Sequence, residues 1–336
     1  MQRVTLGSTE ITVNKNGFGA LPIQRRNMED AVLILKTAYE NKINFFDTAR
    51  FYSDSEKKIG AALSPVRESI FIATKTMAKN TDDFWNDLKA SLENLNTDYI
   101  DIYQFHNPSF CPKPGDGTGL YEAMLVAKTV GKIHHIGFTN HRLELANEAI
   151  DSGLYETLQF PFSYLATERE LDLIKKCKEK NVGFIAMKAL SGGLINDSKV
   201  AYAFMSQFDN VVPIWGIQHM NELMEFVSYN DNPPYMTKET EAIIKKDMDE
   251  LKDEFCRGCG YCMPCPVGID IKMCARMNLL LHRAPSDIYL TPYWQEEMRK
   301  IEDCIGCNNC KSHCPYGLDT PNLLKKNLAA YKAFKK

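Results

Sequence analysis

The residues most clearly arranged for chemistry are cysteines near the end of the chain. Nine of the eleven cysteines lie between Cys256 and Cys314. The run "CIGCNNCKSHC" separates Cys304, Cys307 and Cys310 by two residues each, and Cys314 follows with a proline directly after it. Runs of this spacing that end in Cys-Pro bind 4Fe-4S clusters through their thiolates. The spacing therefore predicts an iron-sulfur site that passes single electrons.

A second run upstream has nearly the same pattern. Its last cysteine, Cys265, also precedes a proline, but only two residues separate it from the cysteine before. In proteins with two such clusters, the proline-flanked cysteine crosses to the other cluster, so its local spacing is less constrained. We therefore expect two 4Fe-4S clusters. One would be bound by Cys256, Cys259, Cys262 and Cys314, and the other by Cys304, Cys307, Cys310 and Cys265.

Zinc is the alternative metal, because tetrahedral zinc sites also use cysteines two residues apart. Triple runs that end in Cys-Pro are not typical of zinc, so we favour iron and sulfur. The clusters could also serve only as structural staples, because a segment as short as residues 250–336 has little core of its own. The sequence leaves open whether the clusters are structural or carry electrons.

The composition is that of an ordinary soluble globular protein. The chain has 336 residues, 44% of them hydrophobic and 25% charged, with a net charge of −3. The lack of basic excess argues against nucleic acid as a partner, and no stretch has the roughly 18 apolar residues of a membrane helix. Crowded cysteines indicate a metal in a reducing compartment rather than disulfides, so we expect a cytoplasmic protein.

Upstream of the cysteines, short apolar runs alternate with amphipathic stretches of helical length. This alternation predicts repeated β-α units around a parallel sheet. The strand candidates are residues 13–19, 43–49, 69–76, 99–106, 132–140, 156–160, 182–188 and 211–216. The number of candidates fits a closed (β/α)8 TIM barrel, an α/β fold, followed by a small and mostly helical iron-sulfur domain.

The domain boundaries follow from changes in composition. Residues 3–13 have two alternating runs around a Gly-Ser turn, which predicts a hairpin that could close the barrel floor. A polar, proline-containing stretch after Val227 ends the barrel pattern. We expect a barrel with its hairpin in residues 1–231, a linker and helix start in 232–249, and the two-cluster domain in 250–336.

Four ionisable residues stand where a barrel carries its chemistry, at the carboxyl ends of strands. Asp47, Lys75 and His106 end three of the strand candidates, and Tyr52 lies in the loop after Asp47. Each of them alone has an ordinary structural explanation. Together at successive strand ends, they predict a site that surrounds one carbonyl group.

The predicted chemistry is carbonyl reduction, which puts hydride on carbon and a proton on oxygen. A phenol with a pKa of about 10 is too weak an acid unless its phenolate is stabilised. The Lys75 ammonium would lower the pKa of Tyr52, and Asp47 would keep that lysine charged and aimed. His106 would orient the substrate oxygen. Tyr52 is then the proton donor.

The segments "FFDTARFY", "ATK", "QFH" and "IGFTN" resemble the aldo-keto reductase family, and the cysteine region resembles the branch of it that is fused to a ferredoxin-type domain. The resemblance covers essentially the whole chain. It implies an Asp-Tyr-Lys-His tetrad, matched by Asp47, Tyr52, Lys75 and His106. It also implies a small carbonyl or alcohol substrate and a nicotinamide cofactor, NAD or NADP, lying across the barrel mouth.

The same resemblance implies where that cofactor binds. Thr139, Asn140 and Gln159 would hold the carboxamide, while the "KALSGG" and "WGIQ" loops would take the phosphates, as loops after the last two strands often do. The full expected set is Gly19, Ala20, Asp47, Thr139, Asn140, Gln159, Met187, Lys188, Ala189, Leu190, Gly192, Gly193, Gly216, Gln218 and Glu222.

Two of these positions depart from the family pattern. Met187 stands where many relatives stack a tyrosine on the nicotinamide, and it still offers a polarisable apolar face. Glu222 aligns near the arginine with which relatives clamp the 2'-phosphate, and a carboxylate there would repel that phosphate or accept a ribose hydroxyl. We therefore expect NAD to suit the site at least as well as NADP.

Two other interpretations stay open. A cluster passes single electrons and a nicotinamide passes pairs, and no flavin motif joins them. The clusters could instead exchange electrons with an external ferredoxin-type carrier, attracted by the lysines of "LLKKNLAAYKAFKK". Alternatively, the tetrad could catalyse a redox-neutral elimination or isomerisation.

Overall fold

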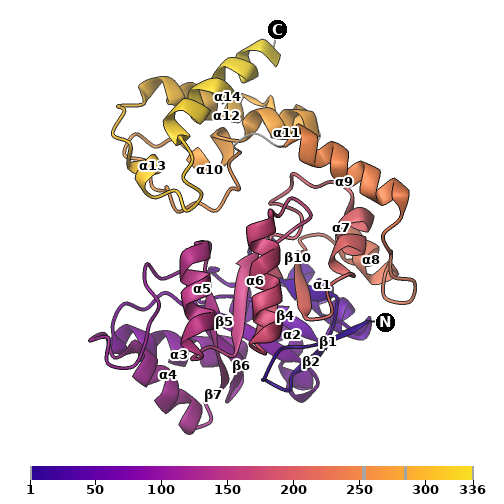
Figure 1. Ribbon diagram of the computed structural model, residues 1–336, viewed down its shortest axis with the longest axis vertical. Helices are drawn as coiled ribbons and strands as arrows, with labels where there is room; N and C mark the ends of the chain where they lie inside the picture. Colours follow the sequence, from indigo (N-terminus) through magenta and orange to yellow (C-terminus); the bar gives the residue numbers. More distant parts are fainter. Residues whose placement is uncertain (1, 252–254, 284–285, 335–336) are drawn as a thin grey trace. The chain divides into compact units, whose positions relative to one another are not determined.

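The computed structural model describes residues 2–251, 255–283 and 286–334. The chain divides into two compact units (Figure 1). Unit 1 is Met1–Ala189 with Lys199–Met236, and unit 2 is Leu190–Ser198 with Thr237–Lys336. The division thus falls five residues after the expected end of the barrel at residue 231. It also assigns Leu190–Ser198 to the second unit, and this stretch includes Leu190, Gly192 and Gly193, which were expected at the cofactor.

Unit 1 is a closed barrel of eight parallel strands, as the alternation of apolar runs predicts. Their order is β10-β3-β4-β5-β6-β7-β8-β9. The strands are β3 Gly17–Gly19, β4 Phe45–Asp47, β5 Phe71–Thr76, β6 Ile100–His106, β7 Ile133–Thr139, β8 Thr157–Pro161, β9 Gly183–Met187 and β10 Val211–Gly216. They are buried almost throughout, which is why they appear in the sequence as continuous apolar runs.

The predicted hairpin is present and packs into the barrel. Strands β1 (Arg3–Thr5) and β2 (Thr12–Asn14) pair antiparallel. The first predicted strand, residues 13–19, was too long, because its start belongs to β2 and only Gly17–Gly19 joins the barrel. Between β2 and β3, the Asn16 side chain donates to the Phe226 carbonyl at 2.8 Å. The hairpin's apolar side chains share one core cluster with residues of the barrel strands. They are Leu6, Ile11 and Val13.

Helices follow the strands around the barrel, and Figure 1 shows α5 and α6 in front of them. The helices are α1 Met28–Glu40, α2 Ser55–Leu63, α3 Thr81–Leu95, α4 Leu120–Thr129, α5 Leu143–Ser152, α6 Glu168–Glu179, α7 Ser198–Met205 and α8 Met220–Ser228, with 3-10 turns η1 Pro22–Arg25 and η2 Ser64–Ser69. Several start at side-chain caps, such as Asn27, which accepts from the Asp30 amide at 2.8 Å. A cap of this kind fixes where the preceding loop ends.

Unit 2 is helical, as expected, and its described part contains no strand. Its elements are α9 Lys238–Glu250, α10 Ile271–Cys274, α11 Met277–Arg283, η3 Ser286–Tyr289, α12 Pro292–Arg299, η4 Lys300–Asp303, α13 Asn309–Ser312 and α14 Thr320–Phe334. A small apolar core includes Ile269, Met277, Leu281, Met298 and Leu324. Cysteines of both runs border this core, so the metal sites predicted from them adjoin what little apolar interior the unit has.

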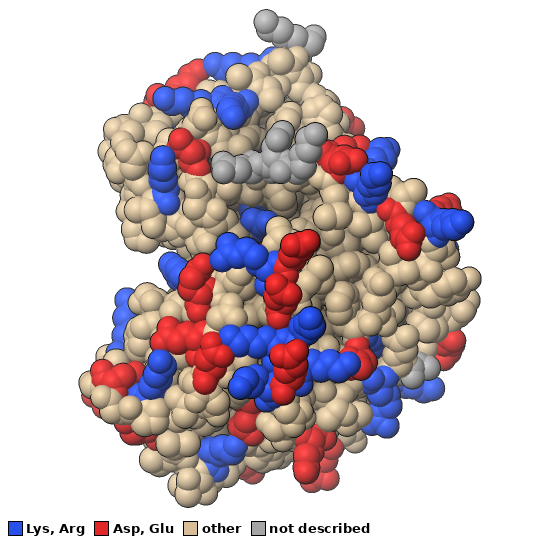
Figure 2. All heavy atoms as spheres, viewed as in Figure 1, with Lys and Arg blue, Asp and Glu red and all other residues tan. Residues whose placement is uncertain are grey.

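Two surface properties complete the description. On the face drawn in Figure 2, basic and acidic side chains are interspersed. Among the residues described, no helix has the length and apolar character needed to cross a membrane.

Candidate functional site

Lys75 and Asp47 form a buried ion pair at the carboxyl end of the barrel. Asp47 ends β4 and pairs in register with Ala73 of β5, which places Lys75 two residues further along that neighbouring strand. The Lys75 Nζ donates to the two Asp47 carboxylate oxygens at 2.8 and 2.6 Å. It also donates to the Thr48 carbonyl at 2.5 Å. Burial lowers the pKa of Lys75 and raises the pKa of Asp47, and the contact between them opposes both shifts.

Tyr52 and His106 lie beside this pair. The Lys75 Nζ is 5.4 Å from the centroid of the Tyr52 ring. The His106 imidazole, at the end of β6, packs edge-on against Tyr52 with 5.7 Å between ring centroids. The structure thus brings together all four residues that the sequence singles out for catalysis.

The His106 imidazole is neutral and has hydrogen-bonding capacity to spare. Burial lowers the pKa of His106 to about 3, and the nearby Lys75 charge lowers it further. Its Nδ1 is buried, with no hydrogen-bond partner in the described part of the chain. An imidazole in this state can hydrogen-bond a substrate oxygen without adding a positive charge to the site.

A chain of amides and a hydroxyl extends from the tetrad across the barrel. Gln159 of β8 donates to the Asp47 carboxylate at 3.3 Å, Gln104 donates to Gln159 at 2.8 Å, and the Thr139 hydroxyl donates to Gln104 at 2.9 Å. Two of the expected carboxamide-binding residues therefore belong to the same network as Asp47. Sequence reasoning missed Gln104, although it precedes His106 by two residues and so lies on the same face of β6.

Asn140, the third residue expected at the carboxamide, shapes a loop. Its amide nitrogen donates to the Pro108 carbonyl at 2.9 Å. Its amide oxygen accepts from the backbone N–H groups of His141 and Arg142, each at 2.9 Å. These contacts fix the segment that follows β7 against the segment that follows β6.

The remaining expected cofactor residues of unit 1 lie at or after strand ends. Gly19, Met187 and Gly216 are the last residues of β3, β9 and β10. The Ala20 amide donates to the Asp47 carbonyl at 2.8 Å, and Lys188 has a left-handed backbone with φ of 57°. Ala189 after it is buried. The parallel strands bring these positions to the same end of the barrel as the tetrad.

Glu222 caps the start of helix α8. Its carboxylate accepts from the backbone N–H groups of Gln218 and His219 at 2.7 and 2.9 Å, which caps the start of α8. The Gln218 side chain in turn accepts from Arg25 at 3.3 Å. The carboxylate expected to meet a ribose or a 2'-phosphate is therefore already engaged with backbone amides.

Leu190, Gly192 and Gly193, expected at the cofactor phosphates, belong to unit 2. The Gly192 carbonyl accepts from the Arg276 guanidinium at 2.7 Å. A methyl group at Gly192 would lie 3.7 Å from the Arg257 carbonyl oxygen, so this loop also lies close to the first cysteine run. The sequence alone gave no signal for Arg276, because it lies far along the chain from Gly192 and outside both cysteine runs.

Cysteines of both runs lie close together in unit 2. One cavity is lined by Cys262, Cys265, Cys304, Cys307 and Cys310, which include all four residues expected at the second cluster. None of the described cysteines forms a disulfide. Among the described residues, no three cysteine, histidine or carboxylate side chains converge as ligands of one metal ion would.

The first run shows the corresponding set. The Cys256 thiol interacts electrostatically with Cys259 and Cys314, and the Gly258 amide donates to the Cys256 sulfur at 3.4 Å. Burial raises the pKa of Cys262 to about 12, with the nearby Cys256 and Cys259 sulfurs raising it further. Thiolates held so close repel one another unless a cationic centre binds them, so the cysteines fit metal clusters.

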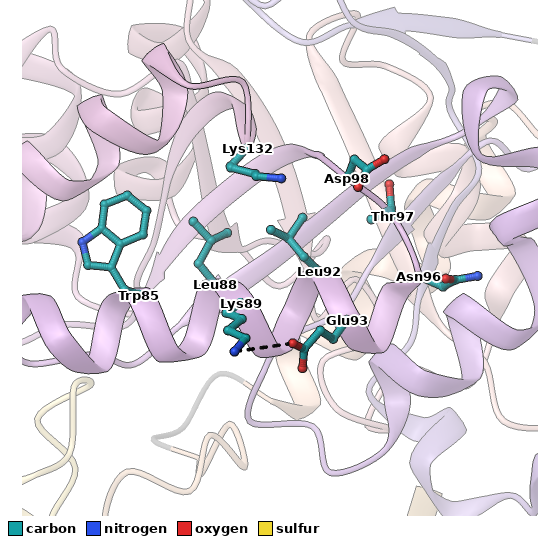
Figure 3. A pocket seen from close by; sticks show the side chains of 9 residues that line it. All are labelled: Trp85, Leu88, Lys89, Leu92, Glu93, Asn96, Thr97, Asp98 and Lys132. Atoms are coloured by element: carbon teal, nitrogen blue, oxygen red, sulfur yellow. Dashed lines mark ion pairs between the residues drawn. The ribbon is translucent and has the colours of Figure 1, made fainter.

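A surface groove lies elsewhere on unit 1 (Figure 3). It has a volume of about 530 Å³ and runs along α3. It is lined by Trp85, Leu88, Lys89, Leu92, Glu93, Asn96, Thr97, Asp98 and Lys132. Asp98 and Lys132 precede β6 and β7, so the groove lies at the amino ends of these strands, opposite to the tetrad.

Comparison with known sequences covers both units. The model of the Aldo/keto reductase family matches residues 15–212, more than half of the chain. The model of a 4Fe-4S dicluster domain matches residues 255–319. Among solved structures, an aldo-keto reductase from Bacillus halodurans in its holo form is similar with a TM-score of 0.64 and 21% identity, covering 74% of this chain and 96% of that one.

Two relatives of known activity are similar over the barrel. L-galactose dehydrogenase of Arabidopsis thaliana is 31% identical over 211 residues, covering 57% of this chain and 66% of the plant protein. NADH-specific methylglyoxal reductase of Escherichia coli is 27% identical over 228 residues, covering 58% of this chain and 69% of that protein. The chain thus spans only about two thirds of the length of these relatives.

Proposed function

The chain belongs to the aldo/keto reductase family, and on that premise we propose that it is an oxidoreductase that interconverts a carbonyl and an alcohol by NAD(P)-dependent hydride transfer. The observation that carries the proposal is the arrangement of Tyr52, Lys75 and His106, with the Lys75 Nζ 5.4 Å from the Tyr52 ring and Asp47 paired to the lysine. Tyr52 is the general acid in reduction and the general base in oxidation.

Each member of the tetrad has a separate task. A bound nicotinamide supplies or receives the hydride. The Tyr52 hydroxyl gives its proton to the carbonyl oxygen, and the Lys75 ammonium stabilises the phenolate left behind. Asp47 keeps that buried ammonium charged and in place. The neutral His106 imidazole hydrogen-bonds the same substrate oxygen, which orients the carbonyl without competing for the proton.

The relatives indicate the class of substrate. One acts on methylglyoxal and the other on L-galactose, so small aldehydes, ketones and aldoses are the first candidates. For the cofactor, the NADH-specific relative supports NAD, whereas a similar structure from Klebsiella pneumoniae, with a TM-score of 0.63 and 20% identity, holds NADPH. Because Glu222 caps α8, its carboxylate disfavours a 2'-phosphate only through its charge, and we propose NAD as the preferred partner.

We further propose two 4Fe-4S clusters in unit 2, with the crossed ligand sets given above. The dicluster match to residues 255–319 and the common cavity of Cys265, Cys304, Cys307 and Cys310 support this. Clusters pass single electrons, so a small ferredoxin-type carrier is the partner that we propose for them. Thiolate clusters of this kind belong in a reducing compartment, which supports a cytoplasmic location.

The test is an anaerobic assay of the reconstituted full-length protein. Methylglyoxal and other small carbonyls are offered with NADH or NADPH, and loss of nicotinamide absorbance is followed. We expect Tyr52→Phe to lower kcat by at least 100-fold while NADH still binds. The matched control is Tyr99→Phe, because Tyr99 lies just before β6, at the opposite end of the barrel. Full turnover by Tyr52→Phe would refute the proposal, as would a redox-neutral conversion of substrate that needs no nicotinamide.

A further inference from the structure

Arg276 connects two stretches of unit 2 that are distant in sequence. Its guanidinium donates to the Gly192 carbonyl at 2.7 Å. A methyl group at Gly192 or at Gly258 would lie 2.9 Å from the same guanidinium nitrogen. Both glycines have left-handed backbones, with φ of 66° and 62°. The lack of a side chain at these bends lets both stretches approach the guanidinium closely.

The charge of Arg276 lacks a carboxylate partner among the ion pairs of the described residues. The groups whose charge acts on it include the Cys256 sulfur, Tyr289 and Asp270. Its Nε is buried and has no hydrogen-bond partner in the part of the chain described. A partly buried cation is costly unless an anion offsets it. A thiolate-bound cluster is negatively charged, and it would supply that anion at Cys256.

Gly258 contacts both the Cys256 sulfur and the Arg276 guanidinium. Its backbone N–H donates to the Cys256 sulfur at 3.4 Å, while its α-carbon lies against the Arg276 guanidinium. Hydrogen bonds to the sulfurs and nearby charge are the main factors by which a protein sets the potential of a cluster. Both factors meet at Cys256.

We propose that Arg276 is a positioning residue that raises the reduction potential of the cluster bound by Cys256 and ties the Leu190–Ser198 loop to that cluster. This inference rests on the proposed function, because it requires the cluster. The reduced cluster carries one more negative charge than the oxidised one, so a fixed cation stabilises it more. Leu190 follows β9 by only three residues. One side chain therefore links the Leu190–Ser198 loop to the redox centre.

Three variants of the full-length protein separate charge from geometry. Arg276→Gln removes the charge but keeps a hydrogen-bond donor. Arg276→Lys keeps the positive charge but loses the planar guanidinium and its several N–H donors. Arg299→Gln is the matched control, because it removes a surface arginine of the same unit that pairs with Glu296 and Asp303.

The first measurement is a potentiometric titration of the reconstituted clusters, followed by electron paramagnetic resonance. At fixed solution potential, we expect Arg276→Gln to lower the reduced-to-oxidised ratio of one cluster about tenfold, which corresponds to about 59 mV for one electron. Arg276→Lys and Arg299→Gln should change it by less than about threefold. The other cluster should be unaffected in all three variants.

The second measurement is hydrogen exchange of the Gly193 and Ile195 amides, which donate to the Leu190 carbonyl at 2.9 and 3.2 Å. Both Arg276 variants should speed this exchange at least tenfold, and Arg299→Gln should not. If the wild type binds two clusters and Arg276→Gln changes neither the potential nor the exchange, the inference is refuted and the proposed function stands. If the wild type binds no iron, the inference and the proposed clusters are both refuted. Should Arg276→Gln fail to fold, unchanged loop exchange in Arg276→Lys still overturns the inference.

Discussion

Replacing Lys75 with methionine is the most informative change in the barrel, because it removes one charge of a buried pair at nearly constant volume. The Lys75 Nζ lies 5.4 Å from the Tyr52 ring. At an effective dielectric constant of about 20, a charge at that distance stabilises a phenolate by about 3 kcal/mol. That amount corresponds to about a hundredfold in rate. We therefore expect kcat/KM of Lys75→Met to fall about 100-fold.

The same substitution also costs stability, in a pH-dependent way. It leaves the Asp47 carboxyl buried without its cation, and breaking such a pair costs about 3–5 kcal/mol. Burial already raises the pKa of Asp47, and loss of Lys75 raises it further. A carboxyl with a raised folded-state pKa contributes stability below its unfolded pKa and loses that contribution as the pH rises. The deficit of Lys75→Met should therefore be larger at pH 8 than at pH 5.

The double variant Asp47→Asn/Lys75→Met separates the two effects. It removes both buried charges, so its thermal midpoint should recover most of the loss while its activity stays low. Activity is measured as kcat/KM with methylglyoxal and NADH, and stability as the thermal midpoint of circular dichroism at both pH values. The reasoning fails if Lys75→Met keeps more than a third of wild-type kcat/KM, or if the double variant is no more stable than the single one.

Further predictions concern the imidazole, the barrel floor and the clusters. Because the pKa of His106 is lowered to about 3, the pH–rate profile between pH 5 and 8 should show no step from this group, and a step that vanishes in His106→Gln would contradict this. Contacts with His135 and Lys128 lower the pKa of Glu156 to about 2, so its stabilising contribution is present above its usual pKa and is lost as the pH falls through 2. Glu156→Gln should accordingly lower the thermal midpoint at pH 7 by several degrees and much less at pH 2. Cys304→Ser should bring the iron content of reconstituted protein to about half, and an unchanged content would exclude Cys304 as a ligand. A strong iron chelator should lower the thermal midpoint of unit 2 and leave the barrel transition in place.

The sequence predicts the barrel well because its signals are local. Most strands are buried runs of largely apolar residues, and some of them end at a polar residue such as Asp47 or His106. The period-2 geometry of strands then places these residues at one end of the barrel. The strand predicted at residues 13–19 is too long, because apolar content alone does not show where the hairpin ends and the barrel begins.

The features that the sequence did not reveal are long-range ones. Arg276 holds Gly192, and this contact does not follow from spacing along the chain. The glycines of the "SGG" stretch were interpreted as room for a phosphate, whereas Gly192 has a guanidinium against it. Sequence patterns show which residue types are present at a loop, but the partner that requires them is supplied by tertiary structure.

The assignment of Leu190–Ser198 to unit 2 also bears on how the protein can be taken apart. The polypeptide crosses between the units after Ala189, after Ser198 and after Met236. The iron-sulfur unit is therefore not simply added to the end of the barrel sequence. A fragment ending at Met236 would retain nine residues whose packing partners have been removed. Excising the oxidoreductase half for separate expression would therefore call for a redesigned segment between Ala189 and Lys199 as well as a new stop codon.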